Sequence, residues 1–127
     1  MSQAHASIVV VDDDPDTVEF LCDYLSQMGF PAVRCPIGPQ VAACIVQHVP
    51  RLVLLDVDLG GLSGLDVFHQ LRAEPTTRQV PVIFFTGNKH RLRHALPDYP
   101  ARGAALVVKP NLTTLRELIL QVLPPPP

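Results

Sequence analysis

Short apolar segments that stop abruptly at a polar residue alternate with amphipathic segments along the whole chain. The apolar segments are rich in Val, Ile and Leu without polar alternation, which is typical of parallel strands buried on both faces. We predict five strands, at residues 7–12, 32–35, 52–55, 82–85 and 105–108. Strand and helix alternating on short connections favours a doubly wound α/β fold, in which helices cover both faces of a parallel sheet.

The segments between these strands repeat apolar residues at helical spacing. Three of them, together with the segment after the last strand, predict amphipathic helices, at residues 15–28, 41–49, 65–71 and 112–123. Proline opens the first helix, glycine follows it, and Pro50 stops the second. We interpret Asp14 as an acid that favours the start of the first helix through its dipole.

Size and charge set limits on the function. A chain of 127 residues with 47% hydrophobic side chains is enough for one domain, which we place at residues 7–123. Residues 1–6 form an N-terminal extension, and the prolines at 124–127 form a tail or the start of a linker. A net charge of −2 gives no overall attraction to nucleic acid or to an anionic membrane surface. Without a secretory signal or a membrane-spanning stretch, we expect a cytoplasmic protein.

The cysteines and histidines show no metal-binding pattern. Cys22, Cys35 and Cys44 are odd in number and lack C-x-x-C spacing. We expect all three to be reduced, with neither zinc nor redox chemistry indicated. The five histidines share no ligand spacing with the acidic residues, and we interpret them as surface or helix residues.

Polar residues follow the predicted strands at their carboxyl ends, where functional groups gather in open α/β sheets. They are Asp12, Asp13 and Asp14 after the first strand, Asp56 after the third, Thr86 after the fourth and Lys109 after the fifth. Carboxylates about 4 Å apart repel by roughly 4 kcal/mol per pair at an effective dielectric near 20, so they need a cation. Oxygen ligands favour Mg²⁺, with Mn²⁺ tolerated.

A divalent ion beside a lysine and a hydroxyl indicates phosphate chemistry. In phosphoryl transfer, the ion and a fixed ammonium neutralise the phosphoryl oxygens while a nucleophile attacks in line. Asp56 is the candidate nucleophile, because it ends a buried strand and precedes Asp58 and the flexible Gly60-Gly61 loop. The product would be an aspartyl phosphate.

Five motifs in chain order resemble the receiver domain of the response regulators of two-component signalling. They are Val9–Pro15, Leu54–Leu59, Ser63-Gly64, Phe85-Thr86-Gly87 and Val107–Pro110. The resemblance covers about residues 7–123 and implies a flavodoxin-like sheet with strand order 2-1-3-4-5. It also implies that the domain catalyses its own phosphorylation from a histidine kinase, a histidine phosphotransfer protein or a small phosphodonor, and then hydrolyses the product.

The resemblance implies a role for each matching acid. Asp56 matches the phosphoacceptor, which also binds the metal. Asp13 matches the acid that binds Mg²⁺ directly, and Asp12 one that acts largely through water. Asp58 matches the position whose backbone carbonyl binds the metal.

The later motifs match residues that act on the phosphoryl group. Thr86 matches the hydroxyl that bonds a phosphoryl oxygen, and Lys109 the lysine that pairs with it, with a cis bond to Pro110 that would aim Lys109 into the site. Asp58 and Asn88 stand at the two positions that tune hydrolysis of the aspartyl phosphate.

The chain departs from the family pattern where output is concerned. Gly60 stands where a proline is usual, and Leu106 occupies a switch position that is commonly aromatic. The fourth helix should lie between the fourth and fifth strands, but Pro97 and Pro100 would end or break it, so we predict a short or distorted helix. A basic cluster in that stretch is either solvated or docks an acidic partner; it comprises Lys89, His90, Arg91, Arg93 and His94.

The sequence therefore predicts a phosphoacceptor domain that switches contacts with a downstream protein, without turnover of a separate substrate. A second copy of the chain is a further candidate partner, whereas membrane and direct nucleic-acid binding are not expected. One alternative is a haloacid-dehalogenase-like phosphatase, because Asp56-Val57-Asp58 resembles its D-x-D motif. That motif normally lies near the chain start, and Gly60 does not fit it. The other alternative is an unphosphorylated interaction module of the same shape.

Overall fold

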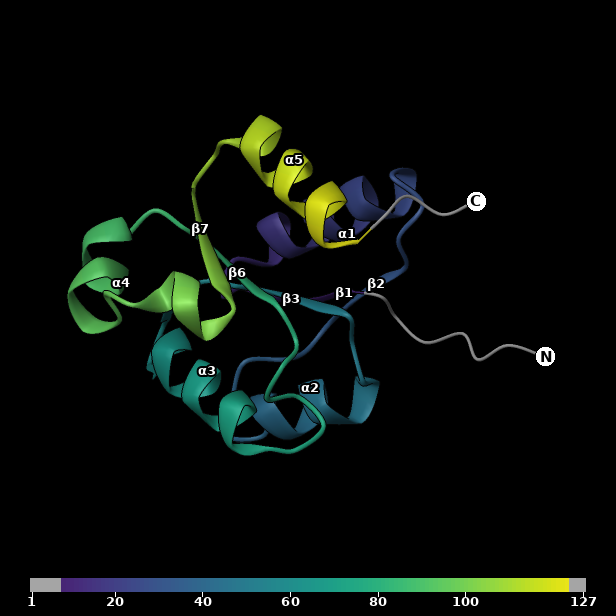
Figure 1. Ribbon diagram of the computed structural model, residues 1–127. Coiled ribbons are helices and arrows are strands. Elements are labelled where there is room, and N and C mark those ends of the chain that lie inside the picture. The colour runs from purple at the N-terminus through teal and green to yellow at the C-terminus, as the bar shows by residue number, and fades with distance from the viewer. Residues whose placement is uncertain (1–7, 124–127) are drawn as a thin grey trace.

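A parallel sheet of five strands runs through the middle of the molecule, in the order β2-β1-β3-β6-β7 (Figure 1). The strands are β1 (Ile8–Val11), β2 (Ala32–Arg34), β3 (Leu52–Leu55), β6 (Val82–Thr86) and β7 (Ala104–Val108). This computed structural model describes residues 8–123, so the expected extension at 1–6, Ser7 and the tail at 124–127 lie outside the described residues. The doubly wound topology and the strand order are both confirmed.

Helices cover both faces of the sheet. They are α1 (Pro15–Gln27), α2 (Val41–His48), α3 (Gly64–Ala73), α4 (Lys89–Ala95) and α5 (Leu112–Val122). Helices α1 and α5 lie over one face, and α2 and α3 over the other (Figure 1). Among the described residues, no helix combines the length and hydropathy that crossing a bilayer requires.

Strand β1 shows why the apolar segments of the sequence are continuous. Ile8 and Val10 belong to the cluster that includes α1 and α5 residues, whereas Val9 and Val11 pack in the cluster with α2 and α3. All four side chains are at most 1% exposed. Because neighbouring residues of a strand point to opposite faces, a strand covered on both sides has no polar position.

Side chains in the loops after the strands cap the helices that follow. Asp14 accepts a hydrogen bond from the Asp16 backbone at the start of α1, and Ser63 accepts one from Leu65 at the start of α3. Asn88 and Asn111 do the same for α4 and α5. Such caps satisfy N–H groups that lack a partner inside the helix. The interpretation of Asp14 as a helix-start acid is thus confirmed.

Helix α4 is short, as predicted. It ends at Ala95, with Pro97 two residues further on, and a 3₁₀ turn, η1 (Tyr99–Arg102), completes the connection to β7. Proline lacks the N–H that a continuing helix would need, and it restricts the residue before it.

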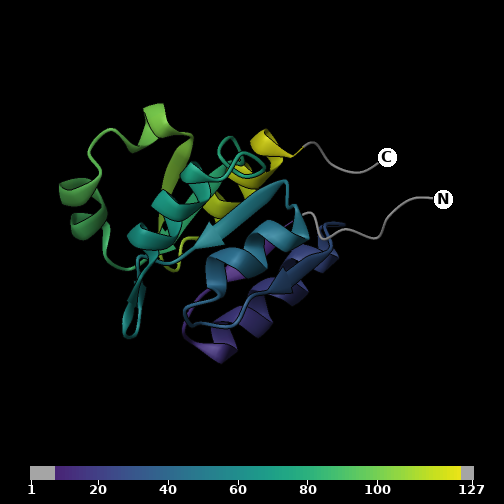
Figure 2. The ribbon, with the colours of Figure 1, turned by 90° about the horizontal axis from the view of Figure 1, so that it is seen from below.

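A small hairpin follows β3 where the sequence indicated only a flexible loop. Strands β4 (Asp58–Leu59) and β5 (Leu62–Ser63) pair antiparallel around Gly60-Gly61. Gly60 has φ +71°, a conformation that favours glycine in such a turn. Strands of two residues are too short to give a periodic signal, and this explains why the sequence did not reveal them. In Figure 2 the hairpin projects beyond the carboxyl end of β3.

Two of the cysteines are joined by a disulfide, so the expectation that all three are reduced was wrong. Cys35 directly follows β2, Cys44 lies on α2, and their Cα atoms are 5.9 Å apart. The turn between β2 and α2 brings the helix back over the end of the strand. Rules based on cysteine spacing do not register this proximity. Cys22 on α1 is free, as expected.

Candidate functional site

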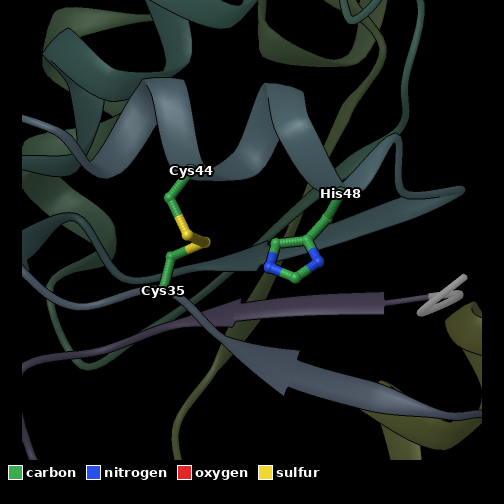
Figure 3. Close-up of side chains that lie close together, drawn as sticks. All are labelled: Cys35, Cys44 and His48. Atoms are coloured by element: carbon green, nitrogen blue, oxygen red, sulfur yellow. A yellow bond between two sulfur atoms is a disulfide. The ribbon is translucent and has the colours of Figure 1, made fainter.

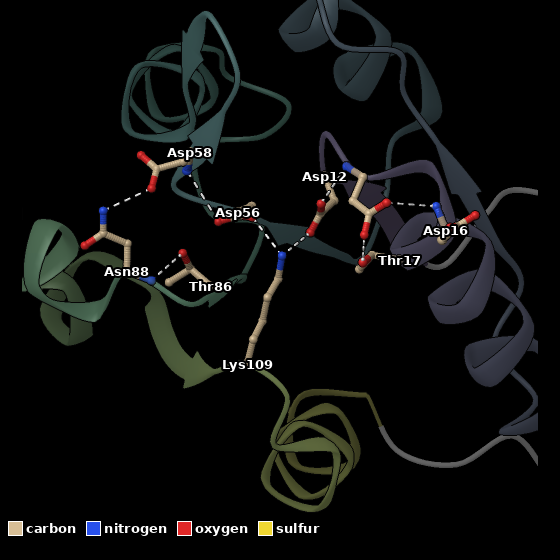
Figure 4. A network of polar contacts seen from close by, with 9 residues as sticks. Asp12, Asp16, Thr17, Asp56, Asp58, Thr86, Asn88 and Lys109 are labelled. Carbon is tan, nitrogen blue, oxygen red and sulfur yellow. Dashed lines mark hydrogen bonds and ion pairs between the residues drawn. The ribbon is translucent and has the colours of Figure 1, made fainter.

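The side chains predicted to be functional lie at one edge of the sheet because parallel strands end there together. Val11 of β1 is paired with Leu55 of β3, and Thr86 ends β6 beside Val108 of β7. The next residues along β1, β3 and β7 are Asp12, Asp56 and Lys109. The strand register therefore gathers residues that lie up to 97 positions apart in the chain (Figure 4).

Three carboxylates form the centre of the site. Asp12, Asp13 and Asp56 each offer an oxygen, and these oxygens all lie within 4.8 Å of one another. Asp12 and Asp56 are each only 7% exposed, whereas Asp13 is exposed. Negative charges this close and partly buried repel one another unless a cation lies among them. The donor set consists of oxygen atoms alone, and it therefore fits a hard divalent ion such as Mg²⁺.

Lys109 places a positive charge among the acids. Its Nζ donates to Asp12 Oδ2 at 2.7 Å and to Asp56 Oδ2 at 2.8 Å (Figure 4). Burial favours the neutral amine, but hydrogen bonds to both carboxylates and their charges prevail, and the pKa of Lys109 is raised. The ammonium is therefore retained at neutral pH. The Lys109–Pro110 peptide bond is cis, as the resemblance implied.

Asp12 has an environment that opposes its ionisation. Burial raises the pKa of Asp12, while hydrogen bonds from Lys109 and from the Asp14 backbone N–H act to lower it. The neighbouring charge of Asp56 adds to the rise. The pKa of Asp12 is therefore raised mainly by burial, and the charge of Asp56 is the smallest of the contributions.

A second polar network adjoins the cluster on the side of α4. The Asp58 backbone N–H donates to Asp56 Oδ1 at 3.3 Å, and the Asp58 carboxylate accepts from Asn88 Nδ2 at 3.0 Å. Arg91 forms an ion pair with the same carboxylate at 2.6 Å and donates to Ser63 Oγ at 3.3 Å. The sequence had placed Arg91 in a solvated or partner-binding cluster, and its pairing with Asp58 was missed.

Thr86 is close to this network but is not joined to the acids. Its side chain is buried, and its Oγ1 accepts a hydrogen bond from the Asn88 backbone N–H at 3.1 Å (Figure 4). Within residues 8–123, no hydrogen bond connects its hydroxyl with Asp56 or Lys109. The hydroxyl proton therefore has no acceptor there.

Gly64 supports Asp56 from behind, and sequence reasoning gave it no physical role. Its N–H donates to the Val57 carbonyl at 2.7 Å. A Cβ built at this position would overlap the carbonyl oxygen of Asp56 directly. The start of α3 can therefore pack against the chain that carries Asp56 only because this residue has no side chain.

Comparisons with known proteins agree on one family. The family model of the response regulator receiver domain matches residues 8–120. The DNA-binding response regulator MtrA of Mycolicibacterium smegmatis is 37% identical over 86 residues, which cover 68% of this chain and 36% of MtrA. A probable cyclic di-GMP phosphodiesterase of Vibrio cholerae is 34% identical over 88 residues, covering 68% of this chain. The match spans only 20% of that relative's length.

A solved structure supports the same assignment. The response regulator protein TrrA of Thermotoga maritima, in complex with Mg(2+)-BeF, matches with a TM-score of 0.78 and 28% sequence identity. The match covers 91% of this chain and 97% of TrrA.

Replacing Gly64 with alanine should displace the backbone of Asp56. We expect Gly64→Ala to lower the free energy of unfolding by about 2–3 kcal/mol, because the new methyl group overpacks a closed contact. Urea denaturation measures this change. Gly61→Ala is the matched control, since a Cβ there meets nothing within 4 Å, and it should stay within about 0.5 kcal/mol of wild type. Equal stability of the two variants would contradict the proposed contact.

Removing the Lys109 ammonium should raise the pKa of Asp12 further, because Lys109 lowers it in the wild type. Carboxyl ¹³C NMR titration of Lys109→Met without divalent ions measures this shift. A folded pKa above the unfolded one stabilises the protein below the unfolded pKa, and this stabilisation is lost as pH rises through the folded pKa. The variant should therefore lose stability toward neutral pH more steeply than wild type. Arg91→Met is the control, and an unchanged Asp12 titration in Lys109→Met would contradict the expectation.

Proposed function

This chain belongs to the response regulator receiver domain family and is a phosphoacceptor signalling domain; on that premise, we propose that Asp56 accepts the phosphoryl group. The observation that supports this choice is its buried carboxylate, which accepts a hydrogen bond from the Lys109 ammonium and has oxygens of Asp12 and Asp13 within 4.8 Å. The proposed donor is the phosphohistidine of a histidine kinase or of a histidine phosphotransfer protein.

We propose Mg²⁺ as the cofactor, with Mn²⁺ as a substitute. The carboxylates of Asp12, Asp13 and Asp56 would hold the ion, and the backbone carbonyl of Asp58 is a further expected ligand. The TrrA structure, which contains Mg(2+)-BeF, supports this choice. When bound, the ion supplies positive charge that neutralises the attacking carboxylate and the phosphoryl oxygens.

The residues of the chain position the two reacting groups. A carboxylate oxygen of Asp56 attacks phosphorus, a P–O bond forms, and the P–N bond of the donor breaks with its electron pair returning to the imidazole. The Asp58 N–H, which donates to Asp56 Oδ1, restricts rotation of the carboxylate before attack. In the later hydrolysis step, water attacks phosphorus and the P–O bond to Asp56 breaks, releasing inorganic phosphate.

Lys109 and Thr86 have complementary proposed roles once Asp56 is phosphorylated. Lys109 already contacts Asp56 Oδ2, so its ammonium needs little movement to pair with a phosphoryl oxygen. Among the described residues the hydroxyl proton of Thr86 has no acceptor, and it is therefore free to donate to another phosphoryl oxygen. Leu106, at the expected switch position, is half-buried against the α2–α3 side of the core. We propose that it repacks without the swing of an aromatic ring and so changes the surface offered to a downstream protein.

Asp58 and Asn88 are proposed to tune the lifetime of the aspartyl phosphate. An acidic Asp58 repels an incoming phosphodonor but can also orient a hydrolytic water. In the structure its charge is compensated by Arg91 and its Oδ2 is occupied by Asn88. Arg91 therefore reduces the negative electrostatic potential that Asp58 produces at Asp56.

The wider biology follows from the family. We propose that residues 7–123 act as one receiver unit in the cytoplasm, like the domain that this chain matches in a DNA-binding response regulator. The domain would catalyse only its own phosphorylation and dephosphorylation, with a downstream protein or a second copy of the chain as its contact. No observation favours the alternative phosphatase chemistry.

The phosphoacceptor is tested by labelling with acetyl phosphate and Mg²⁺, read by intact mass. Wild-type protein should gain one phosphoryl group per chain, and Asp56→Asn should gain none, because an amide cannot form the acyl phosphate. Asp66→Asn, which changes an exposed acid on α3, is the matched control and should label like wild type. Mass gain in Asp56→Asn would disprove the assignment, and sustained turnover of a phosphate ester would instead favour the phosphatase.

The role of Arg91 is tested by the rate of the same labelling reaction. Arg91→Ala leaves the Asp58 charge uncompensated, so phosphorylation by acetyl phosphate should slow by about two- to fivefold, as expected for a half-exposed ion pair. Arg93→Ala removes an exposed arginine from the same helix and should keep the wild-type rate. Equal rates in the two variants would show that the ion pair does not affect the site.

A further inference from the structure

We propose that Cys35, Cys44 and His48 form a zinc site when the two cysteines are reduced. The Sγ atoms of both cysteines and a ring nitrogen of His48 all lie within 4.8 Å of one another. Figure 3 shows the two sulfur atoms and the imidazole meeting between α2 and the end of β2. The cluster plays no part in the phosphoryl chemistry described above.

The local fold explains how three ligands meet here. Cys44 and His48 are four residues apart on α2, so both side chains lie on one face of the helix. Cys35 faces them from the residue after β2, where its backbone N–H donates to the Val10 carbonyl at 3.4 Å. Two ligands on a rigid helix and a third anchored on the sheet reduce the ordering cost of binding a metal.

The donor chemistry selects a metal unlike the one at the acid cluster. Two thiolates and an imidazole suit Zn²⁺, whereas the carboxylates of Asp12, Asp13 and Asp56 suit Mg²⁺. Cys35 is only 3% exposed, but Cys44 and His48 are half-buried. Protein ligands would fill three positions of a tetrahedral ion, and the half-buried side leaves room for a water molecule at the fourth.

The disulfide and the metal exclude each other. The structure shows Cys35 and Cys44 bonded to one another, and neither sulfur is then a thiolate. A dithiol reductant breaks this bond by giving two electrons and two protons, yielding two thiols and its own disulfide. Zn²⁺ binding then releases the two thiol protons to solvent. The cytoplasm keeps thiols reduced, so the compartment proposed above favours the zinc-binding form.

The Cys35–Cys44–His48 cluster lies close to the acid cluster, so a metal titration must distinguish binding at the two. Cys35, Asp12 and Asp13 line the same cavity of about 250 Å³. Co²⁺, the spectroscopic substitute for Zn²⁺, also binds oxygen ligands. The acid cluster is therefore weakened by Asp56→Asn in every protein used for the titration.

The experiment titrates Co²⁺ into protein that has been reduced with a phosphine under anaerobic conditions. One equivalent should produce a near-ultraviolet sulfur-to-cobalt charge-transfer band, and Zn²⁺ should abolish the band by displacement. Cys44→Ser should lose the band. Cys22→Ser is the matched control, because this free cysteine lies on α1 outside the cluster, and it should keep the band unchanged. Air-oxidised protein with the disulfide formed should show no band.

His48→Ala tests the third ligand without touching either cysteine, and circular dichroism checks its fold. Its apparent Zn²⁺ affinity, measured by competition with a chromophoric chelator, should fall at least about tenfold, since a ligand is lost. The proposal is wrong if the reduced protein with all three native cysteines gives no charge-transfer band. It is also wrong if Cys44→Ser keeps the band or if Cys22→Ser loses it. An unchanged affinity in folded His48→Ala would also overturn it.

Discussion

The mutual repulsion of the carboxylates at one edge of the sheet is the constraint on which the arrangement of this molecule depends. Asp12 and Asp56 are buried beside Asp13, and within residues 8–123 Lys109 is the cation that donates hydrogen bonds to both of them. That lysine directly follows β7, two strands away from β3, so the strand order β2-β1-β3-β6-β7 determines which cation reaches the acids. Burial, and to a smaller extent the charge of Asp56, raises the pKa of Asp12 despite the hydrogen bond from Lys109. The site is poised to gain stability from added positive charge.

Most of the fold and the centre of the site could be predicted, because both follow from buried strands. Leu52–Leu55 shows the principle: four apolar residues without alternation require cover on both faces, and the first polar residue after them must be Asp56 at the carboxyl edge. The same reasoning places Asp12, Thr86 and Lys109. Short parallel strands have few registers that keep every side chain buried, so their ends are determined more sharply than those of the helices.

The remaining features could not be predicted because they depend on contacts without a local pattern. Arg91 pairs with Asp58, which lies 33 positions away in the sequence, and both side chains are half-exposed. The pattern of apolar residues therefore gives no indication of this ion pair. The proximity of Cys35 and Cys44 depends on how tightly one turn returns α2 to the sheet. In the sequence Gly64 appeared only as part of a motif. Its lack of a side chain matters because the folded backbone leaves no space for a Cβ there.

The hairpin after β3 connects the proposed phosphoacceptor to the surface of the domain through hydrogen bonds. Asp58 touches Asp56 through its backbone N–H and holds Asn88 and Arg91 of the α4 region through its carboxylate. A binding partner that drew the Arg91 guanidinium away would alter the field at Asp56, and a changed charge at Asp56 would alter how readily Arg91 is released. Linkage makes these two effects equal in free energy. Binding of a target through α4 and phosphorylation of Asp56 would then be thermodynamically coupled, each favouring or opposing the other to the same extent.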